Sequence, residues 1–183
     1  MKNFKIEKNN TAVIAIDFQE RLMPAMRDEE ELCASVVKMV KGARVMNVPI
    51  LVTQQYTRGL GDTIEPIKEA LGEFSPIEKT SFSAFGAEEF VAELEKTGAK
   101  TVILFGIEAH ICVQQTALDL IERGYDVFVA TDCCSSRKKH DKKTAFQRMA
   151  QSGAVLTTVE AVLFEFVGGA KEEGFKQISA IIK

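Results

Sequence analysis

Cys112 is the side chain of this sequence best placed for nucleophilic chemistry. It lies between an apolar run over 101–105, typical of a buried strand, and a predicted helix over 113–123. The N-terminus of a helix carries partial positive charge, which favours a thiolate over a thiol. Free cysteines are also common in protein cores, where they are inert. The other polar residues must therefore decide whether Cys112 is structural or reactive.

A carboxylate, a histidine or a cation could assist such a nucleophile. Asp17 directly follows an apolar, strand-like run, where it can cap a helix or act as a base beside a thiol. His110 precedes Cys112 by two residues, a spacing at which the two side chains need not meet, and His140 lies in a lysine-rich run expected to be a solvated loop and the start of a helix. Lys79 lies in an irregular segment, and a lone lysine is normally a surface charge. An aspartate–cysteine pair assisted by a cation is therefore favoured over a histidine-activated thiol.

Short apolar runs alternate with amphipathic segments along the chain, which indicates an α/β fold. Gly98, Gly124 and Gly153 follow predicted helices, at the position where the chain must adopt a positive φ. This alternation predicts one domain over 1–183, a three-layer α/β/α Rossmann-like domain with a mainly parallel sheet of five or six strands. Strands are expected over 12–16, 50–53, 102–105, 127–130 and 154–158, and helices over 29–46, 87–96, 113–123, 141–151 and 171–182.

The stretch over 55–86 is the least regular part of the chain, because glycines and prolines interrupt it repeatedly. We expect one short helix near 64–71 and otherwise a lid or wall over the site. Asp28 is the predicted N-cap of the helix that begins at residue 29. The apolar segments over 162–167 and 178–182 are expected to lie mostly in the core.

Composition argues against several classes of function. A net charge of −3 leaves no excess of positive charge with which to bind the phosphates of a nucleic acid, so nucleic-acid binding is not expected. No apolar run approaches the roughly 18 residues of a membrane span, and the first ten residues lack the apolar part of a secretory signal, so a cytoplasmic location is expected. The four cysteines form no C-x-x-C pair and have no ligand-like spacing with the two histidines. We therefore expect free thiols and no metal or other cofactor.

Three motifs together resemble the isochorismatase-like cysteine hydrolase superfamily, which includes nicotinamidases and N-carbamoylsarcosine amidohydrolases. The motifs are Ala15-Ile-Asp17-Phe-Gln19, Glu78-Lys79-Thr80-Ser-Phe82-Ser and Gly106-Ile-Glu-Ala-His-Ile-Cys112-Val. The likeness extends over nearly the whole chain. It is closest to the branch of isochorismatase domain-containing proteins, which share Gln19-Glu20-Arg21, Thr53-Gln-Gln-Tyr56, Cys112-Val-Gln-Gln-Thr-Ala-Leu118 and Ala130-Thr-Asp132.

The resemblance implies a catalytic triad of Asp17, Lys79 and Cys112. Asp17 would take the thiol proton and later activate water, while Lys79 would hold Asp17 in place and lower the pKa of Cys112. Cys112 would attack a carbonyl carbon, expel an amine or ammonia and leave a thioester. The backbone N–H groups of Ile111 and Cys112 would stabilise the oxyanion. The resemblance also implies a cis peptide bond between Ile107 and Glu108.

Two departures from the superfamily narrow the expected activity. Nicotinamidases bind a metal through an aspartate and histidines after the second strand, where this chain has Gln54-Gln55-Tyr56, and isochorismatases proper lack the nucleophilic cysteine. We therefore expect a metal-independent cysteine hydrolase that acts on the C–N bond of a small amide or related molecule. The residues expected to form the substrate wall flank the motifs and are Phe18, Gln19, Tyr56, Phe82, Glu108, His110 and Ile111.

The alternative is a catalytically weak member of the superfamily that acts mainly as an oligomeric or partner-binding protein. The resemblance implies a homo-oligomer, a dimer or a higher assembly, under either hypothesis. The two hypotheses differ in the reactivity that they require of Cys112.

Overall fold

The computed structural model describes residues 4–183 and is built around a six-stranded sheet in which every pair of neighbouring strands is parallel. The strands are β1 (Thr11–Ile16), β2 (Ile50–Gln55), β3 (Ile77–Lys79), β4 (Thr101–Gly106), β5 (Asp126–Cys134) and β6 (Val155–Thr157). Their order in the sheet is β3-β2-β1-β4-β5-β6. The predicted α/β class and parallel sheet are confirmed.

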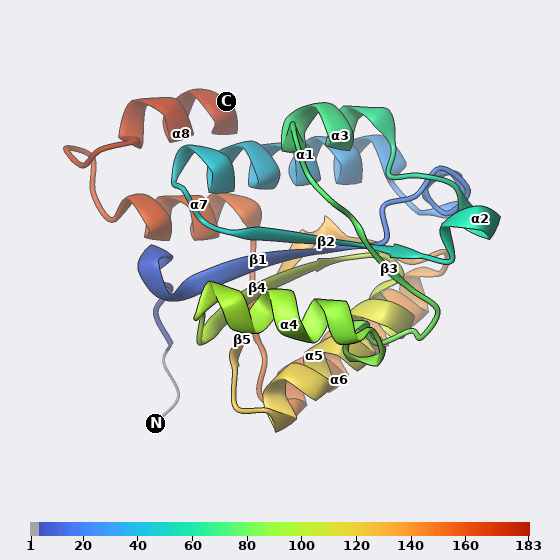
Figure 1. The fold of residues 1–183 in the computed structure, drawn as a ribbon. Helices are drawn as coiled ribbons and strands as arrows, with labels where there is room; N and C mark the ends of the chain where they lie inside the picture. Colours follow the sequence, from blue (N-terminus) through green and yellow to red (C-terminus); the bar gives the residue numbers. More distant parts are fainter. Residues whose placement is uncertain (1–3) are drawn as a thin grey trace.

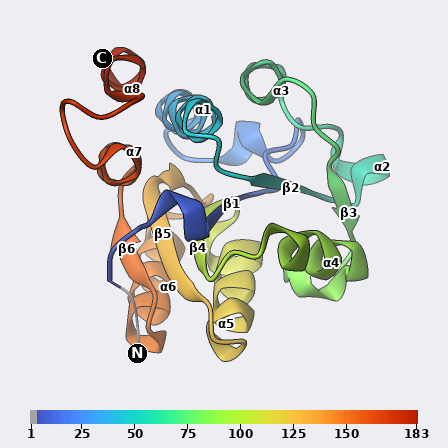
Figure 2. The same ribbon diagram turned by 60° about the vertical axis from the view of Figure 1, so that its left-hand side comes forward.

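Helices cover both faces of the sheet, as the alternating sequence pattern predicts (Figures 1 and 2). One face carries α1 (Glu29–Val45), α3 (Glu65–Leu71), α7 (Val159–Val167) and α8 (Phe175–Ile182). The other carries α4 (Glu88–Thr97), α5 (Gln114–Glu122) and α6 (Lys139–Ser152). The four-residue α2 (Thr57–Leu60) follows the end of β2. Within residues 4–183, no helix is both long enough and apolar enough to cross a bilayer.

Shorter helical turns complete the fold. They are 3-10 turns at Lys8–Asn10, Met23–Ala25 and Ala84–Gly86 and a π-helical turn at Ala109–Val113. The π-helical turn runs directly into α5, so the helix predicted over 113–123 begins as a wider turn that includes Cys112.

The two central strands, β1 and β4, are buried along their whole length, which explains their continuous apolar sequences. From β1 the chain moves through β2 to β3, and it then returns to the other side of β1 as β4. The direction of winding therefore reverses between β1 and β4. Ligands of open α/β sheets bind in the crevice at such a reversal, outside the carboxyl ends of the strands.

β1 and β4 approach each other closely at these carboxyl ends. Gly106 has a φ of +147°, and a Cβ atom added to it would lie 2.4 Å from the carbonyl oxygen of Ile16. Gly106 pairs with Ile16, and the next amide, that of Ile107, donates to the same Ile16 oxygen over 3.0 Å. Glycine is therefore required for the two strand ends to lie this near each other.

Several local predictions need correction. Asp28 precedes α1, but it has a left-handed conformation and its side chain makes no capping hydrogen bond. The irregular stretch over 55–86 contains α2 and the edge strand β3 in addition to the expected short helix. The last helix begins at Phe175, because Gly174 takes a positive φ of +86°.

The apolar segment over 162–167 forms most of α7, a helix that the sequence pattern did not separate from its surroundings. Val162, Leu163 and Phe166 are buried in the core, and Ile178 of α8 is buried as well. The prediction that these segments lie mostly in the core is confirmed for 162–167, whereas in 178–182 only Ile178 is buried and Ile181 and Ile182 are half-buried.

Candidate active site

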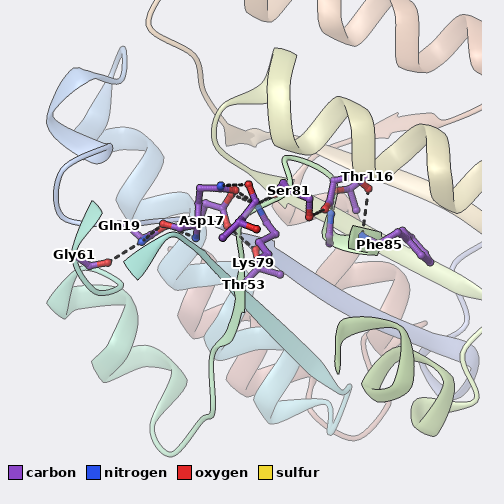
Figure 3. Close-up of polar contacts among 12 residues, drawn as sticks. Asp17, Gln19, Thr53, Gly61, Lys79, Ser81, Phe85 and Thr116 are labelled. Atoms are coloured by element: carbon purple, nitrogen blue, oxygen red, sulfur yellow. Dashed lines mark hydrogen bonds and ion pairs between the residues drawn. The ribbon is translucent and has the colours of Figure 1, made fainter. Parts of the chain in front are cut away.

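Polar side chains gather at the crevice between β1 and β4. Asp17 directly follows β1, Lys79 is the last residue of β3, and the π-helical turn with Cys112 follows β4. Figure 3 shows Asp17 and Lys79 directed toward each other, with Thr53 beside them. The parallel sheet thus brings together residues that are more than sixty positions apart in the sequence.

Asp17 and Lys79 form a fully buried ion pair. Lys79 Nζ donates to Asp17 Oδ2 over 2.7 Å, and neither side chain is exposed to solvent. The hydroxyl of Thr53, on the neighbouring strand, donates to Asp17 Oδ1 over 2.7 Å. Lys79 Nζ also donates to Gln55 Oε1 over 2.7 Å and to the carbonyl of Ser81 over 3.3 Å. Both charges therefore have the partners that a buried ion pair requires.

Cys112 lies beside this ion pair, with 7% of its surface exposed and its thiol within hydrogen-bonding reach of Asp17 and Lys79. Burial raises the pKa of the Cys112 thiol to about 12, and the charge of Asp17 adds to the rise. Lys79 acts in the opposite direction but does not outweigh them. Lys79 therefore lowers the pKa of Cys112, as the resemblance implies, but desolvation of the thiolate exceeds this attraction, so the net change in the pKa is upward.

The turn that carries Cys112 is fixed by contacts with the loop after β5. The peptide bond between Ile107 and Glu108 is cis, and the amide of Ala109 donates to the carbonyl of Ser135 over 2.8 Å. The hydroxyl of Ser135 donates to the carbonyl of Arg27 over 2.9 Å, which connects the same loop to the segment before α1. Three loops that meet at the crevice therefore support one another.

Glu108 and His110 contribute to this support rather than presenting free groups. The Glu108 carboxylate accepts from the backbone amide of Arg137 over 3.0 Å and from its Nε over 3.1 Å. His110 Nδ1 lies 3.0 Å from the hydroxyl of the buried Ser136. Both residues were expected in the substrate wall, but the Glu108 carboxylate and His110 Nδ1 have partners in the loop after β5, and His110 Nε2 lies 3.9 Å from Asp141 of α6.

One of the two expected oxyanion donors, the backbone N–H of Ile111, already has a partner. The backbone N–H of Ile111 donates to the carbonyl of Glu108 over 3.0 Å, so it is occupied in this conformation. The Ile111 side chain is half-buried and packs against the core. A role for this N–H in binding an oxyanion would require it to leave the Glu108 carbonyl.

The remaining expected wall residues divide into two groups. Phe18 is 1% exposed and packs against Phe105 with ring centroids 5.9 Å apart, so it belongs to the core. Gln19 is fully buried and bonds only to backbone atoms in the described contacts. Tyr56 and Phe82 are 51% and 54% exposed and are the expected wall residues that present large surfaces to solvent.

Thr53 and Gln55 contact the ion pair directly but are not among the predicted site residues. Each is a polar residue near the end of a predicted strand, and Thr53 is opposite Ile16 in the register of β1 and β2. That register places the Thr53 hydroxyl next to Asp17. A polar residue at the buried end of a strand was the signal that could have identified them.

Within residues 4–183, no cluster of three or more His, Cys, Asp or Glu side chains has the geometry to hold a metal ion. Oxygen atoms of Asp17, Gln55 and Ser81 instead accept hydrogen bonds from the ammonium group of Lys79.

Comparison with known sequences identifies the family. Residues 11–161 match the profile of the isochorismatase domain. The chain belongs to this family. Isochorismatase domain-containing protein 2A of Mus musculus is 39% identical over 180 residues, which cover 98% of this chain and 85% of the relative. Isochorismatase domain-containing protein 1 of Salmo salar is 38% identical over 173 residues, which cover 94% of this chain. The chain spans only 61% of the length of that relative and 59% of its Danio rerio counterpart.

Solved structures of family members have the same fold. MAR1 ribonuclease from Caenorhabditis elegans has a TM-score of 0.91 and 40% identity, with 97% of this chain and 92% of that chain covered. YcaC from Pseudomonas aeruginosa, determined with hexane-2,5-diol and covalent acrylamide, has a TM-score of 0.93 and 27% identity, covering 100% and 92%. The Escherichia coli YcaC gene product, described as an octameric hydrolase of unknown specificity, has a TM-score of 0.88 and 28% identity, covering 93% and 86%.

Proposed function

We propose that this isochorismatase family member is a metal-independent cysteine hydrolase that cleaves the C–N bond of a small amide or a related molecule. The observation that carries the proposal is the buried Asp17–Lys79 ion pair, both of whose charges act on the thiol of Cys112. A carboxylate beside a protonated thiol can act as its base, and Lys79 balances the negative charge that then moves to sulfur.

The reaction begins with a proton transfer from Cys112 to Asp17 as the sulfur attacks the carbonyl carbon. The C–N bond then breaks, and the departing amine or ammonia takes the proton from Asp17. The product is a thioester on Cys112. Water attacks this thioester while giving a proton to Asp17, the C–S bond breaks, and the proton returns to sulfur. Atoms and charge balance over the cycle, and Lys79 stays protonated throughout.

The exposed rings of Tyr56 and Phe82 are the surfaces that we propose for contact with the apolar part of the substrate. The P. aeruginosa neighbour was determined with covalent acrylamide, an electrophile that thiols attack at its vinyl carbon, which supports a reactive nucleophile in a protein of this fold. The hydrolase description of the E. coli neighbour supports the same reaction class.

Ammonia release from a panel of small amides tests the proposal. Wild type should hydrolyse at least one amide, and Cys112→Ser should lose activity by about a hundredfold or more, because a serine hydroxyl in this site has no comparable nucleophilicity. Cys33→Ser is the matched control, since Cys33 lies on α1 away from the crevice. Quenched turnover mixtures should contain the Cys112 peptide with the added mass of the acyl group. Equal turnover by wild type and Cys112→Ser would refute the mechanism.

The test also separates the two alternatives. RNA is included as a substrate because the C. elegans neighbour is described as a ribonuclease. Cleavage of RNA but not of amides by wild type would replace the proposed reaction. No turnover of any substrate, with a stable oligomer in solution, would favour the catalytically weak, partner-binding protein.

We also propose that the chain forms a homo-oligomer, in keeping with the octameric description of the E. coli neighbour. Light scattering coupled to gel filtration measures the mass of the assembly against the 20.2 kDa of one chain. A mass of 20.2 kDa across a wide concentration range would contradict this proposal.

A further inference from the structure

Lys79 has three N–H donors and three acceptors. Two of its hydrogen bonds are short, to Asp17 Oδ2 and to Gln55 Oε1 at 2.7 Å each, and the third reaches the Ser81 carbonyl at 3.3 Å. A buried ammonium group is strongly penalised when one of its donors lacks an acceptor. Gln55 therefore supplies one of the two close contacts that hold this cation in place.

The position of the Gln55 side chain is itself fixed. Its Nε2 donates to the carbonyl of Thr80 over 2.7 Å, which directs Oε1 toward Lys79. The side chain of the buried Gln19 binds both polar groups of the Gln55 backbone. Its Oε1 accepts a hydrogen bond from the Gln55 amide over 2.7 Å, and its Nε2 donates to the Gln55 carbonyl over 3.0 Å.

The same Gln19 Nε2 donates to the carbonyl of Gly61 over 2.7 Å, so one side chain joins both ends of the segment that contains α2 (Figure 3). A chain of hydrogen bonds therefore runs from this segment through Gln19 and Gln55 to Lys79.

We propose that Gln55 is a positioning residue, which holds the Lys79 ammonium group at the distance where it stabilises the thiolate of Cys112. The proposal rests on the function proposed above for the Asp17–Lys79–Cys112 site. A neutral amide is suited to this role because it binds the ammonium group without adding a second negative charge. A carboxylate at position 55 would compete with Asp17 for Lys79 and would oppose a charge on sulfur. The charged groups that act on the Cys112 thiol are Asp17 and Lys79.

The pH dependence of Cys112 alkylation by iodoacetamide tests this role without requiring a substrate. The rate follows the thiolate fraction, and peptide mass spectrometry separates Cys112 from the other three cysteines. Gln55→Met keeps the side-chain length but removes the acceptor for Lys79. We expect its alkylation rate at Cys112 to be about tenfold lower than that of wild type at each pH, which corresponds to a pKa higher by about one unit.

Gln54→Met is the matched control, because Gln54 is the adjacent residue on β2 and bonds instead to Thr63 and Thr57. It should lower the unfolding temperature but leave the alkylation profile of Cys112 at the wild-type position. Gln55→Glu restores an acceptor and adds a negative charge, so its profile should also move to higher pH. If Gln55→Met does not fold, as judged by circular dichroism, Gln55→Asn carries the test, because its neutral amide is one methylene shorter and should not reach Lys79.

Superimposable profiles for wild type and the folded Gln55 variants would overturn the inference. The outcome is independent of turnover. If the Gln55 variants shift the profile while no amide is hydrolysed, the positioning role stands and the proposed reaction is wrong. If amides are hydrolysed through Cys112 and the profiles coincide, the reaction stands and the positioning role is wrong.

Discussion

Cys112 keeps its proton at neutral pH because its surroundings disfavour a thiolate. Burial and the neighbouring Asp17 raise the pKa of the thiol to about 12, and Lys79 offsets only part of the rise. A protonated thiol is a weak nucleophile. In the proposed reaction Asp17 must therefore remove the proton as the bond between sulfur and carbon forms, so the same carboxylate that suppresses the free thiolate also generates it when a substrate is present.

Asp17→Asn should separate these two effects. Loss of the carboxylate leaves the charge of Lys79 unbalanced beside Cys112, so the pKa of the thiol should fall and alkylation at about pH 8 should become roughly tenfold faster. Hydrolysis should fall by about 10²–10⁴ because the base is gone. Glu172→Gln, an exposed carboxylate between α7 and α8, is the control and should change neither rate. Slower alkylation of Asp17→Asn would mean that the carboxylate promotes the resting thiolate.

At the scale of elements, the crevice depends on the close approach of β1 and β4 and on the loops that meet beyond them. Asp17 and the turn with Cys112 leave these two strands at the same edge of the sheet. The turn is held by the loop after β5 through the Ala109 amide and the Glu108 carboxylate. The geometry of the site therefore depends on the loops that follow β1, β4 and β5.

Gly106→Ala should disrupt this geometry severely. The new methyl group would meet the Ile16 carbonyl at 2.4 Å, and alanine would also have to adopt a φ of +147°. We expect a loss of about 3 kcal/mol or more in the free energy of unfolding, measured by urea denaturation, or failure to fold. Gly124→Ala is the control, because Gly124 also has a positive φ but an added Cβ has no atom within 4 Å. Its cost should be about 1 kcal/mol. Equal losses would show that the contact with Ile16 is unimportant.

Much of the arrangement of elements follows from local sequence. Continuous apolar runs identify β1 and β4, and Gly98 and Gly153 mark the ends of α4 and α6. β3 was not predicted because it has only three residues, two of which are charged. A strand this short is defined by pairing with β2, which local sequence does not encode.

The residues of the candidate site could be predicted mainly because the motifs that contain them resemble those of a known family. Lys79 could not be selected from its own sequence position, because only the fold buries it beside Asp17. Glu108 and His110 were predicted to face a substrate, but their partners, Arg137 and Ser136, come from a loop remote in sequence. Contacts of that kind depend on how two loops pack, so neighbouring residues do not reveal them.

At the scale of the whole molecule, three of the four cysteines are buried. Burial is the main cause that raises the pKa of Cys134 to about 12 and that of Cys133 well above its usual range, as it does for Cys112. In the unfolded chain these thiols titrate near their ordinary value of 9.0. Above that pH the unfolded chain binds fewer protons than the folded protein, so the folded state loses stability as the pH rises.

The free energy of unfolding should therefore decrease from about pH 8 to about pH 10, by up to about 1.4 kcal/mol per pH unit for each fully buried thiol. Below the ordinary pKa of a thiol, the buried thiols make their full contribution to the free energy of unfolding. Cys134→Ala should be less stable than wild type at both pH values, because it creates a cavity, but its stability should depend less steeply on pH. Cys33→Ala should change the slope less, since Cys33 is only partly buried. Urea denaturation at the two pH values measures both slopes, and identical slopes for wild type and Cys134→Ala would contradict the argument.

The protonated state of Cys112 also bears on reactions other than hydrolysis. Peroxides and many electrophiles in cells react with thiolates far faster than with thiols. A sulfur atom with 7% exposure and a pKa of about 12 should therefore react slowly with such molecules. In the proposed reaction, the proton on Cys112 would act as a reversible protecting group, which Asp17 would remove only as the sulfur attacks a carbonyl carbon.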